Sequence, residues 1–260
     1  MRLFKGKFFL FLLLIFIAQS AYPEHLIYEI EWGLIPVANA QLEWNAGDNK
    51  LILSAEISSS GPLALFRNFE SNVNLSYNED KNIIYSQVGI DRGKPENKII
   101  EYSDTHIPVV HDFMDDQTNN HLETDQATDG GSVNPMIALM KTIQNLQKDQ
   151  KCNQTYKVYD GKRRYELRTR AIENEVSDQN YRDLVVHKCR FVMINLSEMK
   201  KKNRINQKQK NSWPYDAKNE NKYIDVWFSE DYEYLPVYFK FKAPIGYLEG
   251  KVRNTFNFKF

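Results

Sequence analysis

Most of this chain follows a hydrophobic pattern with a period of two. In residues 26–32, 38–44 and 50–57, apolar side chains occupy every second position, and most of the positions between them are charged or polar. Successive side chains of a strand point to opposite faces of a sheet. The pattern therefore predicts strands that have one face covered and the other in water.

The alternation returns several times after a short helical or irregular piece expected at residues 61–68. Further strands are predicted at 73–77, 83–90, 98–102, 184–194, 224–228, 237–241 and 247–252. Short turns join most of them, which favours antiparallel neighbours. We therefore expect an all-β, mainly antiparallel fold, built as a single strongly curved sheet or half-open barrel, because curling disposes of unpaired edges.

One stretch has a helical period instead. Asn134 is a good N-cap residue, and Pro135 follows at the first helical position. The apolar residues after it fall on one stripe: Met136, Leu139, Met140, Ile143 and Leu146. This predicts an amphipathic helix at about residues 134–148 that packs against the sheet.

The central segment, residues 155–167, predicts a β-hairpin. Asp160-Gly161 favours a two-residue turn of type I′, and that turn would pair Val158 with Arg163. One hairpin face would then be apolar except for one arginine: Tyr156, Val158, Arg163, Tyr165 and Leu167. A lone buried guanidinium is costly, so Arg163 must be paired or must reach water.

Arg163 allows two interpretations. It can form an internal ion pair, or pack its stem at the sheet rim while its head reaches solvent. Alternatively, it lies at the mouth of an apolar cavity and binds the carboxylate or phosphate of a ligand. The second interpretation gives one set of candidate ligand-binding residues: Arg163, Tyr156, Tyr165, Met136 and Met140. Methionines and aromatic rings suit an adaptable pocket, and they suit an ordinary core equally well.

The N-terminus predicts export. Three basic residues precede an apolar run at residues 8–18, and small residues follow it, as in a signal peptide cleaved after Ser20. The run is shorter than the ~20 residues that a spanning helix needs. We therefore expect a periplasmic protein with a single β domain at residues 21–260. In such a protein the two cysteines, Cys152 and Cys189, are expected to form a disulfide.

Charge gives little guidance about partners. The chain has 34 basic and 34 acidic residues, and three of the basic ones lie in the predicted signal peptide. This balance excludes a general attraction to nucleic acid or to anionic membranes. Residues 112–132 are acidic and amide-rich, and residues 199–221 contain a basic run. Both are expected to be surface loops.

Familiar catalytic and metal-binding motifs are absent from the sequence. There is no Gly-x-Ser-x-Gly, no His-Glu-x-x-His, no phosphate-binding glycine loop and no zinc-type cysteine spacing. His106, His111 and His121 lie among acidic residues, without the i, i+4 spacing that makes a helical metal site recognisable. We expect no cofactor and no metal, and an enzyme is the least favoured class.

Several segments together resemble a known family. They are residues 28–38, Asn134 to Leu139, Cys152, Val158 to Leu167, Cys189, Val226-Trp227 and Pro236. In this order they resemble an exported family of proteobacteria catalogued as domain of unknown function 3108. That family usually has Asp at the position of Asn134 and a small polar residue at that of Ile137. The resemblance implies a periplasmic protein, and it supplies no activity, catalytic residue or cofactor.

Three hypotheses follow for the function. In the first, a non-enzymatic periplasmic protein binds an amphiphilic or lipid-like ligand in an apolar groove. In the second, a structural or assembly factor contacts an envelope protein through the loops at 112–132 or 199–221. The third is an outer-membrane β-barrel, because Phe256, Phe258 and Phe260 end the chain as the last strand of such a barrel would. The expected disulfide and the amphipathic helix weigh against it.

Overall fold

A computed structural model describes residues 24–47, 50–77, 82–104, 106–114, 131–161, 164–172, 180–181, 184–195, 223–243 and 246–253. The predicted signal peptide, the loop at 199–221 and the C-terminal phenylalanines lie outside these residues. So do most of the loop predicted at 112–132 and Arg163 itself.

The described residues form mainly strands, with two α-helices and one 3-10 turn. The first strands are β1 (Glu24–Trp32), β2 (Ile35–Gly47), β3 (Lys50–Ser59), β4 (Phe69–Tyr77), β5 (Ile83–Asp91), β6 (Lys94–Tyr102) and β7 (Val109–Met114). The later strands are β8 (Gln154–Tyr159), β9 (Arg164–Ala171), β10 (Asn180–Tyr181), β11 (Leu184–Asn195), β12 (Tyr223–Ser229), β13 (Leu235–Lys242) and β14 (Tyr247–Val252). The helical elements are α2 (Gly61–Phe66), α3 (Pro135–Asp149) and η5 (Glu230–Tyr232).

All these strands belong to one antiparallel sheet. Its order is β7-β6-β5-β4-β3-β2-β1-β14-β13-β12-β11-β9-β8, with β10 paired to β11 beside this path. In the described part of the chain no pairing joins β7 to β8, so the sheet does not close. The predicted single curved antiparallel sheet with one packed helix is confirmed.

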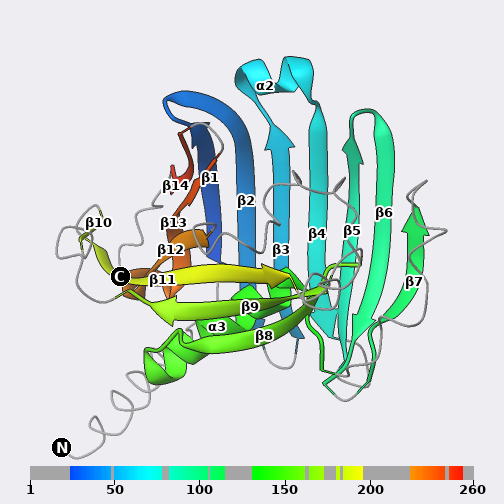
Figure 1. The fold of residues 1–260 in the computed structure, drawn as a ribbon, viewed down its shortest axis with the longest axis vertical. Helices are drawn as coiled ribbons and strands as arrows, with labels where there is room; N and C mark the ends of the chain where they lie inside the picture. The colour runs from blue at the N-terminus through cyan, green and yellow to red at the C-terminus, as the bar shows by residue number, and fades with distance from the viewer. Residues whose placement is uncertain are drawn as a thin grey trace, which may run out of the picture.

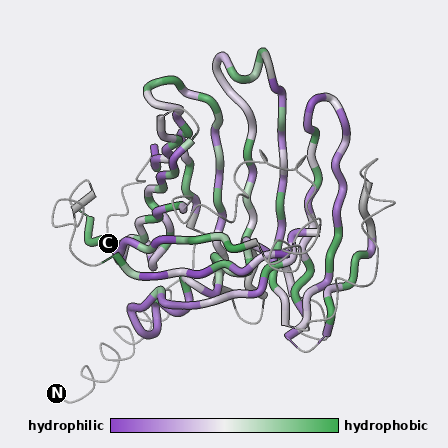
Figure 2. Tube along the Cα trace, in the orientation of Figure 1, coloured by the Kyte–Doolittle hydropathy of each residue, from purple (hydrophilic) through white to green (hydrophobic). Residues whose placement is uncertain are grey.

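The sheet curls so that its two limbs face each other. In Figure 1, β2 to β6 stand side by side, and β8, β9 and β11 cross in front of them with α3 behind β8 and β9. Figure 2 shows hydrophilic and hydrophobic residues alternating along the strands. The buried core contains apolar residues from both limbs and from the helix, including Leu53, Leu75, Ile100, Ile143 and Phe228. We call the side of the sheet that faces this core the inner face.

Helix α3 begins as the sequence predicts. The Asn134 side chain accepts a hydrogen bond from the Met136 backbone N–H at 2.8 Å. The buried face is centred differently from the predicted stripe, because Ile137 and Ala138 are fully buried whereas Leu139 is only half-buried. Among the described helices, none has both the length and the apolar character required to cross a bilayer.

The predicted two-residue turn at Asp160-Gly161 is wrong. Tyr159 pairs with Arg164 and Val158 with Tyr165, so four residues, 160–163, connect β8 to β9. A type I′ turn needs positive φ at both central residues, and of this pair only Gly161 has it, at 91°. Tyr156, Val158, Tyr165 and Leu167 still share one face, because the register changed by an even number of residues.

The connection between β8 and β9 packs against the other limb of the sheet. The Lys98 ammonium on β6 donates to the Asp160 carbonyl at 2.9 Å, and the Tyr102 hydroxyl donates to the Tyr159 carbonyl at 2.8 Å. We call Lys98, Tyr102, Tyr159 and Asp160 the seam. It holds the two limbs together where no strand pairing does.

A second difference concerns residues 112–114, which were expected to begin the long surface loop. They extend β7 and pair with β6, with Met114 opposite Asn97 and Asp112 opposite Ile99. Asp112 therefore occupies a position on an edge strand, where the backbone can pair regardless of a polar side chain.

Candidate functional site

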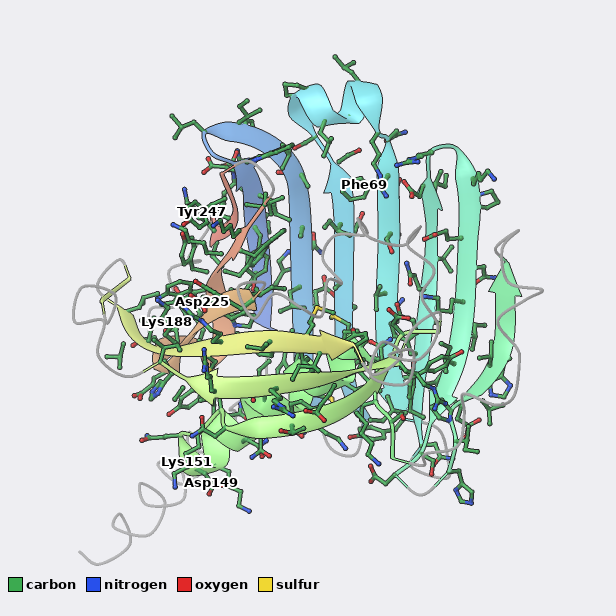
Figure 3. All side chains as sticks on the ribbon, in the orientation of Figure 1. Phe69, Asp149, Lys151, Lys188, Asp225 and Tyr247 are labelled. Atoms are coloured by element: carbon green, nitrogen blue, oxygen red, sulfur yellow. A yellow bond between two sulfur atoms is a disulfide. The ribbon has the colours of Figure 1, made fainter. Side chains whose placement is uncertain are left out.

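A groove of about 240 Å³ lies along strands β11 to β14. Its lining residues are charged or aromatic: Lys188, Arg190, Tyr223, Asp225, Trp227, Tyr238, Lys240, Phe241, Lys242 and Tyr247. Figure 3 labels three of them, and they form a column from Lys188 on β11 through Asp225 to Tyr247 on β14. We call this feature the cation–aromatic groove.

Strand register brings the groove residues together. Arg190 lies opposite Asp225, Asp225 opposite Lys240, and Lys240 opposite Glu249, so four strands contribute one row of alternating charge. A second row places Lys188 opposite Trp227 and Trp227 opposite Tyr238. Directly opposed residues on one face interact across a sheet. Because their neighbours Cys189, Val226 and Phe228 belong to the buried core, these rows lie on the outer face.

The lower part of the groove is built around one buried carboxylate. Arg190 donates two hydrogen bonds to Asp225, at 2.6 and 2.8 Å. The Lys188 ammonium is 3.8 Å from the same carboxylate, and the Lys188 and Asp225 side chains are only 8% and 9% exposed. Two cations therefore share one anion in a partly desolvated place, where charge interactions are stronger than in water.

Aromatic rings hold the cations in position. The Arg190 guanidinium is 3.5 Å from the centre of the Tyr223 ring, and the Lys188 ammonium is 4.6 Å from that of Trp227. Farther along the groove, the Lys240 ammonium is 4.4 Å from the centre of the Tyr247 ring. Cations at such distances over ring faces are attracted by the ring quadrupole. These contacts restrict the cationic side chains, so a ligand loses less freedom in binding them.

The upper edge of the groove is a network of half-buried charges. The Lys240 ammonium contacts Glu249 at 3.0 Å, and Lys251 lies 2.7 Å from Glu31 and 3.6 Å from Glu249. Burial acts to raise the pKa of Glu249, but the hydrogen bonds from Lys240 and Tyr238 and the charges of the two lysines leave it below its usual value. Glu249 is therefore ionised at neutral pH, and it orients Lys240 toward the groove.

The lining residues together favour an anion. Four of them are basic, Lys188, Arg190, Lys240 and Lys242, and one is acidic, Asp225. Lys242 is exposed at the end of β13 next to Tyr247. A concave site with this surplus of positive charge attracts carboxylate or phosphate groups, and the rings beside it can pack on an adjacent sugar, glycerol or alkyl group.

The four described residues of the ligand-binding set predicted from the sequence lie elsewhere. Tyr156, Tyr165 and Met140 are buried in the core between α3 and the strands, and Met136 packs half-buried against it. The Tyr156 hydroxyl is 3.1 Å from the Thr142 hydroxyl. The structure thus brings these four residues into one core region, and their role in ligand binding stays a prediction, as does that of Arg163.

The predicted disulfide is present. Cys152 and Cys189 are bonded, with Cα atoms 6.1 Å apart, and both side chains are buried. The bond joins the segment that precedes β8 to the middle of β11. Because Lys188 and Arg190 flank Cys189, it also fixes the strand that carries two of the groove cations.

Sequence reasoning missed the groove, although a signal was present. The polar positions of β11 and β12 read Lys188, Arg190 and then Tyr223, Asp225, Trp227, an alternation of charged and aromatic residues on one face. Alternation was used to find the apolar face, and the opposite face was assumed to be solvated. Which strands are neighbours cannot be read from that pattern.

Comparisons with known proteins support the fold and leave the function undecided. The family described as "Protein of unknown function (DUF3108)" matches residues 27–253. No curated protein matches the chain. The crystal structure of a beta-barrel-like protein of domain of unknown function DUF1849 from Brucella abortus is similar, with a TM-score of 0.54 and 10% sequence identity. The alignment covers 89% of this chain and 96% of that one, and at this identity it shows a likeness of fold alone.

Proposed function

The chain belongs to the DUF3108 family of proteins of unknown function, and we propose that it is a non-enzymatic periplasmic protein of the cell envelope that binds an amphiphilic, lipid-like ligand by its anionic head group. The cation–aromatic groove is the observation that carries this proposal. The head group would lie between the cations of β11 and β13, beside the rings of Tyr223 and Tyr247.

The chemistry of the lining favours binding over catalysis. The groove residues include no serine, threonine, cysteine or histidine. Its one carboxylate, Asp225, is held by two hydrogen bonds from Arg190. Because the guanidinium occupies both oxygens, this carboxylate is poorly placed to accept a proton from a substrate. Fixed cations next to ring faces are instead suited to holding an anion and the group attached to it.

The groove replaces Arg163 as the best-supported place for the head group. In the sequence-based hypothesis, a single arginine on the inner face was to bind it. The groove offers several cations whose positions are described, and the cations of its upper part, Lys240 and Lys242, are more exposed than Lys188. The apolar part of the ligand would pack along the ring of Tyr247 at the upper edge of the groove.

Calorimetric titration with two soluble probes tests this proposal. Glycerol 3-phosphate carries the charge of a phospholipid head group, and glycerol lacks it. We expect the processed chain to bind the phosphate ester and not glycerol. The double variant Lys240→Gln/Lys242→Gln should bind it at least about tenfold more weakly, because two charge-assisted contacts are lost. Lys151→Gln, an exposed lysine near α3 and far from the groove in Figure 3, is the matched control.

The result would contradict the proposal if glycerol 3-phosphate failed to bind, or if the double variant bound it like the unchanged chain.

The cellular location of the protein is tested separately. The chain expressed with its own N-terminal segment should be released by osmotic shock, in a form shortened by about twenty residues. Retention inside the spheroplast would rule out the periplasmic part of the proposal.

A further inference from the structure

One end of the sheet exposes several large apolar side chains. Antiparallel pairing places the β1–β2, β3–β4, β5–β6 and β13–β14 connections at this end, and α2 forms one of them. The exposed residues are Trp32 at 41%, Leu34 at 93%, Ile35 at 53%, Leu65 at 85% and Tyr247 at 47%. We call these five residues the apolar tip. In Figure 1 the β1–β2 turn and α2 project at the top of the molecule.

Backbone contacts link the turns that carry the tip residues. The Gly33 backbone N–H donates to the Tyr247 carbonyl at 3.0 Å, which joins the β1–β2 turn to β14. The Trp32 indole reaches within 3.8 Å of the place that a Cβ on Gly246 would occupy. On the other side, α2 packs on the start of β2, where Ser60 donates to the Val37 carbonyl at 2.8 Å. Three connections distant in sequence therefore lie next to one another at this end of the sheet.

The composition of these turns is unusual. Tight turns normally carry glycine, proline, asparagine, aspartate or serine, and an exposed leucine there gains nothing in folding. At the β1–β2 turn, Gly33 supplies the positive φ, and the residue after it is Leu34, the most exposed of the five. A group of exposed apolar side chains in one place marks an interaction site, whereas single exposed ones need no explanation.

The charges around the tip are mainly positive. The described turn residues at this end include four basic side chains, Arg67, Arg92, Lys94 and Lys242, and one carboxylate, Asp91. Arg67 pairs with Asp91 at 2.8 Å, and the four basic and one acidic side chains together leave these turns with an excess of positive charge. This local surplus contrasts with the nearly neutral balance of the whole chain, and it is complementary to a negatively charged surface.

We propose that the apolar tip docks on the surface of a bilayer that contains anionic lipids. Aliphatic side chains on projecting turns, a Trp and a Tyr beside them, and basic residues around them match the requirements of the lipid interface. There, apolar groups enter the acyl boundary, amphipathic rings lie at head-group level, and cations contact lipid phosphates. A protein partner would instead need a flatter surface of roughly 800 Å² on each side, and the tip consists of separate projecting turns.

Docking at this end would place the groove next to the membrane. Tyr247 belongs to both the tip and the groove, and Lys242 lies opposite Tyr247 in the strand register. A lipid head group could therefore enter the groove from the bilayer surface. This last point rests on the proposed function, whereas docking itself depends only on the tip.

Vesicle co-sedimentation of the processed chain tests the docking. We expect binding to vesicles of phosphatidylglycerol mixed with phosphatidylcholine, and binding at least about tenfold weaker to phosphatidylcholine alone. Leu34→Ser/Leu65→Ser should lower binding to the anionic vesicles by at least about tenfold, because it removes the two most exposed aliphatic side chains. Ile107→Ser/Val185→Ser changes two exposed apolar residues outside the tip and should bind like the unchanged chain.

Quenching of tryptophan fluorescence by brominated lipid gives a second measurement. The anionic vesicles should quench the chain, and Trp32→Phe should remove most of that quenching, since Trp32 is the most exposed of the described tryptophans. If the unchanged chain ignored the anionic vesicles, or if the leucine variant bound them equally well, the inference would be overturned.

The two proposals fail separately. The leucine variant should still bind soluble glycerol 3-phosphate, because Leu34 and Leu65 do not line the groove. If the chain bound the vesicles through its leucines but did not bind soluble glycerol 3-phosphate, the docking inference would stand and the proposed ligand would be ruled out. The reverse pattern would remove the docking alone.

Discussion

Asn134 shows how one buried side chain can serve several elements. It is 2% exposed, and its amide oxygen accepts the Met136 N–H at the start of α3. Its amide also acts on the phenols of Tyr85 and Tyr102, whose hydroxyls donate to the Gln87 side chain and to the Tyr159 carbonyl. Burial raises the pKa of both phenols, more than the hydrogen bond from Asn134 lowers it. An amide suits this position because it can accept from the backbone and donate to the phenol oxygens at the same time.

Replacing Asn134 by alanine should therefore cost more than an ordinary helix cap. We expect Asn134→Ala to lower the free energy of unfolding by about 2–3 kcal/mol, because the Met136 N–H loses its acceptor and a cavity opens at a buried position. Asn134→Ser keeps an acceptor for the Met136 N–H and loses the contacts with the tyrosines, so its cost should be smaller. Urea unfolding of the three proteins measures both differences. Equal stability of the alanine variant and the unchanged chain would contradict this role.

At the scale of elements, the disulfide fixes the junction between α3 and the strands that carry the groove. Cys152 follows the helix and precedes β8, and Cys189 lies in the centre of β11. The two residues are 37 positions apart. Closing a loop of that length restricts the unfolded chain, and on the chain-entropy estimate this stabilises the fold by about 3–4 kcal/mol.

Reduction should lower the stability by about that amount. Guanidinium unfolding with and without dithiothreitol measures the loss as a lower midpoint. The double variant Cys152→Ala/Cys189→Ala should unfold at a low midpoint in both conditions, which separates loss of the bond from other effects of the reductant. If the unchanged chain unfolded at the same midpoint with and without reductant, the disulfide would not contribute to stability.

Elements that depend on local pattern could be predicted from the sequence. Strands β1 to β6 follow from alternation, and α3 follows from the cap at Asn134 and the helical period after it. The turn at Asp160-Gly161 was wrong because its conformation is decided by a contact from far away, the Lys98 hydrogen bond to the Asp160 carbonyl. Strand β7 was missed because an edge strand needs no apolar alternation in order to pair.

At the scale of the whole molecule, the arrangement of the strands was out of reach. Curling of the sheet was expected from the need to cover its edges. The order of the strands was not predictable, because β1 pairs with β14 and their residues are more than two hundred positions apart in the sequence. The groove depends on this order, because Lys188, Asp225, Lys240 and Tyr247 come from four strands. Only the fold brings these residues together, so no motif in the sequence marks the site.

The seam is the feature that makes the curled sheet one unit. Tyr102 is 2% exposed, and its hydroxyl donates to the Tyr159 carbonyl across the two limbs. Beside it, the Tyr159 N–H donates to the Val133 carbonyl at 2.9 Å, so this end of β8 is held from two sides. Losing one of these bonds should loosen the β8–β9 end of the sheet before it affects β1 to β4.

Tyr102→Phe tests this role, because it removes one oxygen and keeps the ring. We expect it to lower the free energy of unfolding by about 1–2 kcal/mol, since a buried carbonyl is left without that donor. Amide hydrogen exchange should become faster at residues 156–167 and stay unchanged in β2 and β3, as expected for local opening. Tyr247→Phe, on an exposed ring, is the matched control and should change the stability by less than about 0.5 kcal/mol. Uniform acceleration across all strands would mean that the sheet opens as a whole, and that the seam has no separate role.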